Sequence, residues 1–589
     1  MSLNQISYTL PSELQDHVSE AIEAWTGDDM TNRVWQKDAS VWTGGDESKW
    51  LGWLDIVAEE SEHTVKYRRL SADIEGGGFT HVLLMGMGGS SLCPEVLATT
   101  FGKKTFHILD STVPSQVKAI EEKLDLPNTL FIVASKSGST LEPNCFKQYF
   151  FDRVTKISDS PGKQFVAITD PGSKLEQIAK DDGFRHIFYG KPEIGGRFSA
   201  LSAFGLAAAS AIGLDVEILL KRAEEMVEAC RSSDARANPG ALLGIILGVS
   251  HRFGRDKLTI FTSPEVYDLG AWLEQLIAES TGKEGVAIIP VDREPVLSRV
   301  QRPASGRPVP TEGGTPERYS SDRVFVHIGV KSTVTVDDQY RLMEDLEREG
   351  HPVIRIELES LYHISQEFFR WEFATAVAGS VMKINPFDQP DVESAKVEAR
   401  KITDEYERSG SLPDEAPFFE DGSTSLYSND SNIASLNEVV GGRPSLSNYL
   451  DAHVSRINEN DYFALLAYLE MNSENEKLLQ SIRKQVLRRT GVATCLGFGP
   501  RFLHSTGQAY KGGPNTGVFL QITSDDEADL PVPGQKYTFG VVKAAQARGD
   551  FQVLLDRERR AVRVHLKGST REGLERILAA LITNQGTHQ

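Results

Sequence analysis

From residue 80 onward, short runs of consecutive apolar residues alternate with stretches of helical periodicity. Four such runs occupy residues 81–86, 105–110, 129–135 and 164–170. Because each run is apolar at successive positions and not at every second one, it predicts a strand buried on both faces. The spacing leaves room for a crossover helix between strands. This part of the chain is therefore expected to form a doubly wound parallel sheet.

The same alternation returns after a mostly helical section at 198–253. Further apolar runs lie at 257–263, 285–291, 323–330 and 352–358. A chain of 589 residues is too long for a single core, which also favours several domains. We therefore expect an α/β protein with two doubly wound parallel-sheet domains of similar build.

The remaining segments extend this domain plan at both ends. The expected units are a helical lead-in at 1–78, a first domain at 79–253, a second domain at 254–408, an irregular linker at 409–447 and a smaller α/β unit at 448–589. The lead-in carries tryptophans expected to anchor it on the body, namely Trp35, Trp42, Trp50 and Trp53. A Pro/Gly-rich stretch at 293–317 predicts an excursion loop from the second domain.

Composition excludes several classes of function. The net charge of −20 argues against nucleic-acid binding, although a cleft can still be locally positive. The four cysteines are far apart, and neither a CxxC nor an HExxH motif occurs, so neither a disulfide framework nor a metal site is expected. The N-terminus lacks the pattern of a signal peptide. Residues 198–214 predict a buried helix and not a membrane span, so we expect a cytoplasmic protein.

The stretch FIVASKSGSTLEPN (131–144) ends a predicted strand in small and polar residues and continues into a helical pattern. Its hydroxyl residues, Ser135, Ser137, Ser139 and Thr140, lie at a strand C-terminus, where open α/β sheets bind ligands. Backbone N–H groups and the helix dipole favour an anion there, and the hydroxyls can donate to phosphate oxygens. No P-loop motif is present. A phosphate site is preferred; the alternative is a polar loop whose hydroxyls only cap the helix.

A second strand, glycine turn and helix occupy LLMGMGGSSLCPEVL (83–97). Gly88 and Gly89 allow a tight approach of the backbone, and Ser90 can add a hydroxyl. A dinucleotide fingerprint is the alternative, with Asp110 at a suitable distance for a ribose. Against it, Ser91 occupies the third glycine position of GxGxxG, and a partial match is a weak signal. Two hydroxyl loops in one domain fit a small sugar phosphate better than a dinucleotide.

Five motifs in order resemble the phosphoglucose isomerase family, which is built on paired sugar-isomerase (SIS) domains. They are GMGGSSLCP, SKSGSTLEP, GGRFSALSAFG, EQLIAESTGK and NPFDQPDVESAK, between about residues 80 and 400. The lead-in and the tail at 497–523 are similar to the isomerase half of bacterial fusions of transaldolase with this isomerase. The chain has no room for the transaldolase barrel. The resemblance therefore implies two SIS domains, an additional C-terminal α/β unit and isomerase activity alone.

The resemblance also implies a role for each site residue. The phosphate of a sugar phosphate would be bound by Gly89, Ser90, Ser135, Ser137 and Thr140, with Lys136 adding positive charge. Glu279 would be the base that moves a proton between C1 and C2, and Arg197 would stabilise the enediolate. Gln389 and Lys396 would line the sugar site, with Lys396 assisting ring opening. The family further implies a homodimer and no cofactor.

One departure from the family pattern concerns the histidine that opens the sugar ring. The family carries it in a loop after the glutamate motif, but residues 291–308 contain no histidine. His504, in the polar loop FLHSTGQAYKGGP, is the preferred substitute, and His363 is the other candidate. Spontaneous or Lys396-assisted opening is a further alternative.

Four functions are weighed on these observations. Interconversion of glucose 6-phosphate and fructose 6-phosphate is the first, and isomerisation of another phosphorylated aldose such as mannose 6-phosphate is the second. A non-catalytic SIS module that binds sugar phosphate is the third. A nicotinamide-dependent enzyme is the fourth and the least favoured.

Overall fold

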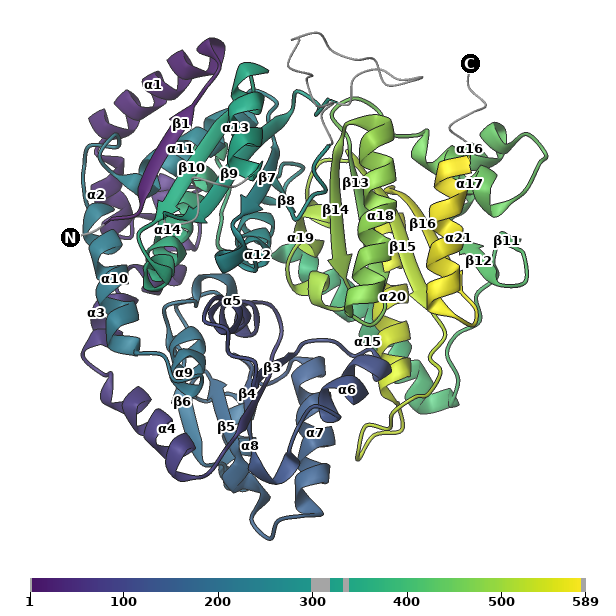
Figure 1. The fold of residues 1–589 in the computed structure, drawn as a ribbon, viewed down its shortest axis with the longest axis horizontal. Helices are drawn as coiled ribbons and strands as arrows, with labels where there is room; N and C mark the ends of the chain where they lie inside the picture. Colours follow the sequence, from purple (N-terminus) through teal and green to yellow (C-terminus); the bar gives the residue numbers. More distant parts are fainter. Residues whose placement is uncertain (1–2, 298–317, 332–337, 584–589) are drawn as a thin grey trace.

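The computed structural model describes residues 3–297, 318–331 and 338–583, and within them the strands form three sheets (Figure 1). The first sheet, ordered β3-β2-β4-β5-β6, is parallel throughout. Its strands are β2 (His81–Met85), β3 (Phe106–Leu109), β4 (Thr129–Ala134), β5 (Phe165–Thr169) and β6 (His186–Tyr189). The four predicted apolar runs correspond to β2–β5, whereas β6 is only four residues long and partly exposed, so it carries no continuous apolar signal.

The second sheet is ordered β1-β10-β9-β7-β8. Its strands are β1 (Gln5–Thr9), β7 (Lys257–Thr262), β8 (Ile289–Asp292), β9 (Arg323–Val330) and β10 (Val353–Leu358). The lead-in is therefore not wholly helical, because β1 pairs antiparallel with β10 at the sheet edge. Most of its side chains are exposed, so hydrophobic periodicity could not reveal this strand. Most of the predicted excursion loop at 293–317 lies outside the described residues.

The third sheet is ordered β11-β12-β16-β15-β13-β14. Its strands are β11 (Phe419–Glu420), β12 (Thr424–Tyr427), β13 (Tyr462–Tyr468), β14 (Ala493–Phe498), β15 (Gly517–Ser524) and β16 (Arg560–Leu566). The segment 409–447, expected to be irregular, contributes two of these strands and an eleven-residue helix, α16. The strands have only two and four residues, which is too short for a sequence pattern to show periodicity.

The parts of the chain built on the first, second and third sheets are called the first, second and third units. All three sheets share one arrangement of their parallel strands. In each, the first strand lies between the second and the third, as in β3-β2-β4, β8-β7-β9 and β14-β13-β15. Successive crossovers therefore leave the first strand in opposite directions, and a crevice opens between the loops at its carboxyl end. The mixed α/β class with doubly wound sheets is confirmed, and the C-terminal unit repeats the strand order of the other two.

Helices cover these sheets and connect them (Figure 1). The N-terminal helices are α1 (Ser12–Gly27), α2 (Met30–Trp35), α3 (Ile56–Ser61) and α4 (Val65–Gly76). Those of the first unit and the section after it are α5 (Leu92–Thr100), α6 (Pro114–Glu121), α7 (Leu141–Thr155), α8 (Lys174–Asp181), α9 (Ala203–Ala211), α10 (Val216–Ala229) and α11 (Pro239–Arg252). The second unit has α12 (Leu269–Thr281), α13 (Asp338–Arg348) and α14 (Ile364–Met382). The rest are α15 (Pro390–Ser409), α16 (Asp430–Val440), α17 (Leu446–Val454), α18 (Ser473–Thr490), α19 (Gly507–Gly512), α20 (Phe539–Asp556) and α21 (Thr570–Thr583).

The first two units share one hydrophobic core, and the tryptophans of the lead-in pack in it or against it. Trp53 is fully buried and stacks on Phe198, with ring centroids 5.4 Å apart. The indole of Trp42 donates to the carbonyl of Ala376 at 2.8 Å. The predicted anchoring role of the tryptophans is confirmed by these contacts.

Two further expectations concern apolar segments. Helix α9, within the apolar stretch 198–214, is buried along its whole length, so it is a core helix as expected. Among the described residues, no helix combines the length and hydropathy needed to cross a membrane. The four cysteines are all buried and unpaired.

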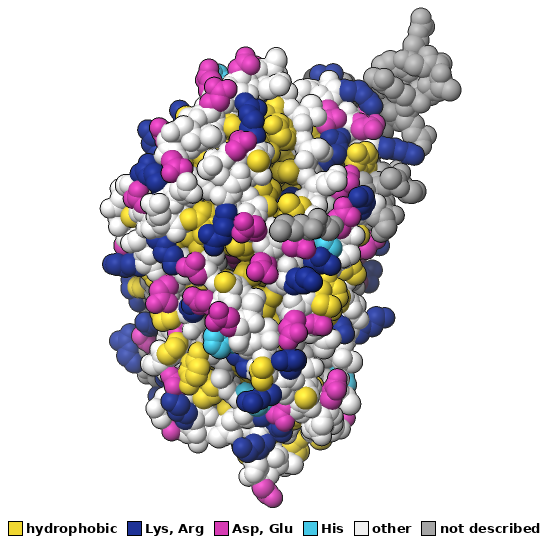
Figure 2. Space-filling model, turned by 90° about the vertical axis from the view of Figure 1, so that its left-hand side faces the viewer, with side chains coloured by type: hydrophobic (Ala, Val, Ile, Leu, Met, Phe, Trp, Pro, Cys, Tyr) yellow, Lys and Arg dark blue, Asp and Glu magenta, His cyan; other side chains and the backbone are white. Residues whose placement is uncertain are grey.

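The face of the molecule that lies on the left of Figure 1 carries a mixed surface. Figure 2 shows lysine, arginine, aspartate and glutamate side chains interspersed there, with hydrophobic atoms in small patches between them. This face therefore presents no extended field of one sign, in contrast to the basic stripe typical of a nucleic-acid-binding surface.

Candidate active site

The two loops singled out in the first unit lie at its topological switch point. One follows β2 and the other follows β4, on the two strands that neighbour each other in the sheet. Gly89 must be a glycine, because an added Cβ would lie 1.9 Å from the carbonyl oxygen of Gly196. The glycine turn is therefore packed directly against the segment that carries Arg197.

Asp110, the residue that would bind the ribose of a dinucleotide, is already hydrogen-bonded within the protein. The carboxylate of Asp110 accepts a hydrogen bond from Arg501 Nε at 2.7 Å and another from Ser91 Oγ at 3.2 Å. Asp110 is also only 2% exposed. A ribose has no access to this carboxylate, which disfavours the dinucleotide alternative.

The hydroxyl loop, residues 135–140, folds back on itself through its own side chains. Ser137 and Ser139 hydroxyls lie 2.7 Å apart, and the Ser135 hydroxyl is 3.3 Å from that of Thr140. Thr140 stands at the N-cap of α7 but makes no side-chain capping bond. Helix capping alone therefore does not account for the hydroxyls. Ser137, Ser139 and Thr140 line a pocket of about 790 Å³ between the first unit, α15 and the third unit.

Lys136 lies within the hydroxyl loop but is engaged elsewhere. Its ammonium group is 2.8 Å from Asp170 and donates to the carbonyl of Lys191 at 2.9 Å. It is not among the side chains that line the pocket. The positive charge that the resemblance places beside the phosphate is thus neutralised by a carboxylate of the same sheet.

Arg197 is the most constrained of the predicted site residues. The side chain is 1% exposed, and its Nε donates to Ser280 Oγ at 2.7 Å while Nη1 donates to Gln389 Oε1 at 2.7 Å. Nη2 donates to two carbonyls in the segment 386–388. Burial lowers the pKa of Arg197, and the carboxylates of Glu279 and of residue 388 oppose that shift. Glu279 Oε2 lies 3.7 Å from Nη1, so Arg197, Glu279 and Gln389 are brought together as predicted.

A row of hydrogen bonds connects Glu279 to the hydroxyl loop. Gln275 Nε2 lies 3.3 Å from Glu279 Oε2 and donates to the carbonyl of His504 at 2.8 Å. The ring Nε2 of His504 is 2.8 Å from Glu142 Oε1, and Glu142 follows Thr140 by two residues. The candidate base and the candidate phosphate loop are therefore neighbours in the fold.

His504 comes from the third unit, in the loop that follows β14, the edge strand of that sheet. Arg501, three residues earlier, binds the carboxylates of Asp110 and Glu95 at 2.7 and 2.8 Å. These ion pairs dock the loop onto the first unit. His363, the other candidate, lies at the start of α14 with its Nδ1 2.8 Å from Ser360 Oγ, and it does not line the pocket.

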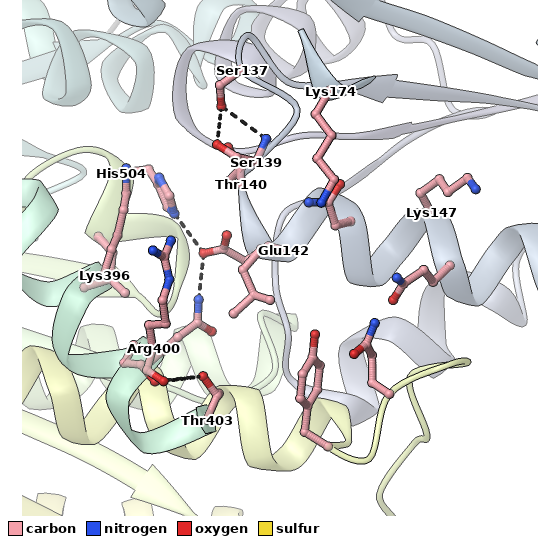
Figure 3. Close-up of a pocket in the computed structure, with 18 of the residues that line it drawn as sticks. Ser137, Ser139, Thr140, Glu142, Lys147, Lys174, Lys396, Arg400, Thr403 and His504 are labelled. Atoms are coloured by element: carbon pink, nitrogen blue, oxygen red, sulfur yellow. Dashed lines mark hydrogen bonds and ion pairs between the residues drawn. The ribbon is translucent and has the colours of Figure 1, made fainter. Parts of the chain in front are cut away.

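Glu142 has two partners from the third unit. Its Oε1 lies 2.8 Å from His504 Nε2 and accepts a hydrogen bond from Gln546 Nε2 at 2.6 Å (Figure 3). Burial alone would raise the pKa of Glu142, but the charge and hydrogen bond of His504, with the charge of Lys396, lower it below its ordinary value. The neighbouring imidazole and ammonium group thus favour the ionised form of the Glu142 carboxylate.

Of the predicted residues, Ser137, Thr140, Lys396 and His504 line the pocket itself. Gly89, Ser90, Ser135, Arg197, Glu279 and Gln389 are not among its lining residues. Gln275, Glu142 and Gln546 were not predicted. Glu142 lies inside the SKSGSTLEP motif, and Gln275 lies one helical turn before Glu279. Both could therefore have been identified from neighbouring residues in the sequence. Gln546 lies 404 positions from Glu142, and no local pattern could have joined them.

Residues 55–293 match the phosphoglucose isomerase family. This match spans less than half of the chain. The matched segment includes the glycine turn, the hydroxyl loop, Arg197 and Glu279, whereas Gln389, Lys396 and His504 lie beyond it. No comparison bears on the predicted likeness to transaldolase fusions, which stays a prediction.

Individual relatives agree with this family. A glucose-6-phosphate isomerase of Methanocaldococcus jannaschii is 28% identical over 365 residues, which cover 59% of this chain and 88% of that protein. A glucose-6-phosphate isomerase of Gloeothece citriformis is 36% identical over 214 residues, which cover 35% of this chain and 40% of that protein. The crystal structure of the hypothetical protein TT0462 from Thermus thermophilus has a TM-score of 0.54 at 24% identity, covering 67% of this chain and 99% of that one. This last likeness concerns the fold.

Proposed function

We propose that this chain interconverts glucose 6-phosphate and fructose 6-phosphate. The observation that carries the proposal is the hydrogen-bonded row from Glu279 through Gln275 and His504 to Glu142, which ends beside the hydroxyl loop. Aldose–ketose exchange needs an anchor for the phosphate, a base on one face of the C1–C2 bond and a cation or donor where charge develops on oxygen. Relatives named as glucose-6-phosphate isomerases support the same reaction.

The mechanism begins with the closed sugar ring. His504 donates a proton to the ring oxygen while the anomeric hydroxyl gives its own proton to solvent, which gives the open-chain aldehyde, and Lys396 assists this step. Glu142 holds the imidazole in position through the contact between its Oε1 and the ring Nε2. The phosphate stays at the hydroxyl loop throughout.

Proton transfer then converts the aldose into the ketose. Glu279 removes the proton from C2, and the electron pair forms the C1–C2 double bond of an enediolate, with negative charge on O1. The same carboxylic acid returns the proton to C1 while the hydroxyl proton of O2 passes to O1, so that O1 becomes a hydroxyl and O2 becomes the carbonyl. Arg197 is fixed by its acceptors before any charge develops, so it stabilises the enediolate without reorganisation.

Incubation of the purified protein with single sugar phosphates tests the proposal. Fructose 6-phosphate is expected from glucose 6-phosphate in a coupled assay without added metal or nucleotide. Faster turnover of mannose 6-phosphate would favour the second function. Binding of both sugar phosphates without turnover would favour the non-catalytic module. A cytoplasmic location and a homodimer stay predictions.

The pH dependence of turnover is expected to reflect Lys283, which lies four residues after Glu279. Its buried ammonium donates to the carbonyl and the carboxylate of Asp388 at 2.5 and 2.6 Å, next to the carbonyls that hold Arg197. Burial and the charge of Arg197, against the attraction of Asp388, lower the pKa of Lys283 to about 8.

Because Lys283 is charged only below that pKa, kcat is expected to fall above about pH 8 as the segment holding Arg197 loosens. The Lys283→Arg variant keeps its charge at high pH, so its alkaline limb should move upward. The measurement is a pH profile of kcat for both proteins. Identical alkaline limbs would contradict the assignment to Lys283.

A further inference from the structure

Of the cations that line the pocket, Lys147 is paired with Asp182, and two others are used neither by the sequence motifs nor by the mechanism. They are Lys174, at the first position of α8, and Arg400, on α15 one turn after Lys396. Both line the same pocket as the hydroxyls of residues 137, 139 and 140. Figure 3 shows them reaching into it from opposite walls, Lys174 from the first unit and Arg400 from α15.

The backbone fixes Lys174 beside the hydroxyl loop. Its main-chain N–H donates to the carbonyl of Ser137 at 3.3 Å. Gly138, at φ +66°, packs so closely on the start of α8 that an added Cβ would lie 2.2 Å from the nitrogen of Leu175. The loop and the first turn of α8 are therefore one rigid unit. Within the described parts of the chain, the ammonium group of Lys174 meets no carboxylate and no hydrogen-bond acceptor.

Arg400 is held on the opposite wall by the packing of its helix. Helix α15 runs against α20, where Gly549 allows contact so close that a Cβ there would lie 2.7 Å from the nitrogen of Ala399. Among the residues that the structure describes, the guanidinium of Arg400 has no carboxylate or other acceptor. This contrasts with Lys136, whose charge is already neutralised by Asp170.

The positive and negative side chains of α8 and α15 are unevenly distributed along the pocket. On α8, Lys174 is the first residue and Asp181 the last, about 10 Å away along the axis. On α15, Lys396 and Arg400 are followed one turn later by Asp404. Toward the hydroxyl loop the pocket therefore has these cations and the Glu142 carboxylate, which His504 and Gln546 already engage, whereas Asp181 and Asp404 lie toward the outer rim. In a chain of net charge −20, such a local reversal marks a site for an anion.

We propose that Lys174 and Arg400 hold the phosphate monoester of the substrate between them at the hydroxyl loop. Three hydroxyls supply hydrogen bonds, and the two cations balance the two negative charges of the phosphate from opposite sides. The sugar then extends from the phosphate toward His504 and Glu279. The identity of the ligand as a sugar phosphate rests on the proposed function, whereas the anion site itself does not.

Inorganic phosphate is the probe for the anion site, titrated calorimetrically into the full-length protein at low ionic strength. In Lys174→Gln and in Arg400→Gln, phosphate affinity is expected to fall about tenfold each, since one charge-assisted hydrogen bond is lost. KM for glucose 6-phosphate should rise similarly while kcat changes less, because a remote anchor contributes mainly to binding.

Matched controls remove one positive charge from the same helices outside the pocket. Lys180→Gln removes a lysine of α8 that pairs with Glu176, and Lys401→Gln removes a lysine of α15 that pairs with Glu398. Neither is expected to change phosphate affinity. Losses of the same size in the controls would show a general charge effect and overturn the proposal.

The outcomes separate this proposal from the proposed function. Weaker phosphate binding in both pocket variants, in a wild-type protein that fails to isomerise any sugar phosphate, would sustain the anion site and reject the isomerase. Wild-type isomerisation with unchanged phosphate affinity in either variant would sustain the isomerase and reject the two-cation site.

Discussion

Glu279→Gln is expected to lower kcat for isomerisation of glucose 6-phosphate by about 10³-fold, within the range for loss of a positioned acid–base group. Glutamine has almost the same shape as glutamate, and its amide oxygen can still accept from Gln275 Nε2. What it lacks is a basic oxygen that can take a proton from C2. Because the phosphate is held at the hydroxyl loop and not by Glu279, KM should change little. Steady-state kinetics measure both constants.

A second variant controls for the loss of one carboxylate. Glu284 lies five residues further along the chain and is exposed, so Glu284→Gln should retain the wild-type kcat. Thermal unfolding of both variants establishes whether they fold, since Glu279 lies beside the buried guanidinium of Arg197. A folded Glu279→Gln protein that isomerises at the wild-type rate would show that another group moves the proton.

The sequence predicted those features of the fold that depend on continuous hydrophobicity. Strands β2, β4 and β5 are buried at nearly every position, and each corresponds to a continuous apolar run. The hydroxyl loop was found for the same reason, because its residues follow directly from the end of β4. Parallel strands then place the glycine turn beside it at the switch point.

Features that depend on contacts distant in sequence could not be predicted in this way. Strand β1 is formed by mostly exposed residues and exists because the edge of β10 offers unpaired backbone groups. Lys136 looked like a phosphate ligand from its neighbours, but Asp170 at the end of β5 competes for its charge. Gln546 reaches Glu142 only because the third unit packs against α7.

The third unit is the part of the site that the family resemblance explains least, because the family match ends at residue 293. Its strand order repeats that of the other two units, and the loop with His504 follows its edge strand, β14. This loop places His504 beside Glu142 of the first unit, and the ion pair of Arg501 with Asp110 holds the loop in position.

His504→Gln is expected to lower kcat by about 10²-fold, because ring opening loses its acid catalyst. The glutamine amide can still donate to Glu142, so the loop that Arg501 docks should keep its position. KM for glucose 6-phosphate and the unfolding temperature should therefore stay close to those of the wild type. An unchanged kcat would instead mean that the ring opens without this histidine, spontaneously or through Lys396.

A mixture of the Glu279→Gln and His504→Gln proteins tests whether a single chain supplies all the residues of the site. Glu279→Gln retains His504, and His504→Gln retains Glu279, so a site shared between two chains would regain activity when the proteins are mixed and allowed to exchange subunits. In the structure both residues are linked within a single chain through Gln275. The mixture is therefore expected to show only the summed residual rates of its components. Recovery well above that sum, after unfolding and refolding the variants together, would place His504 in the site of a neighbouring copy.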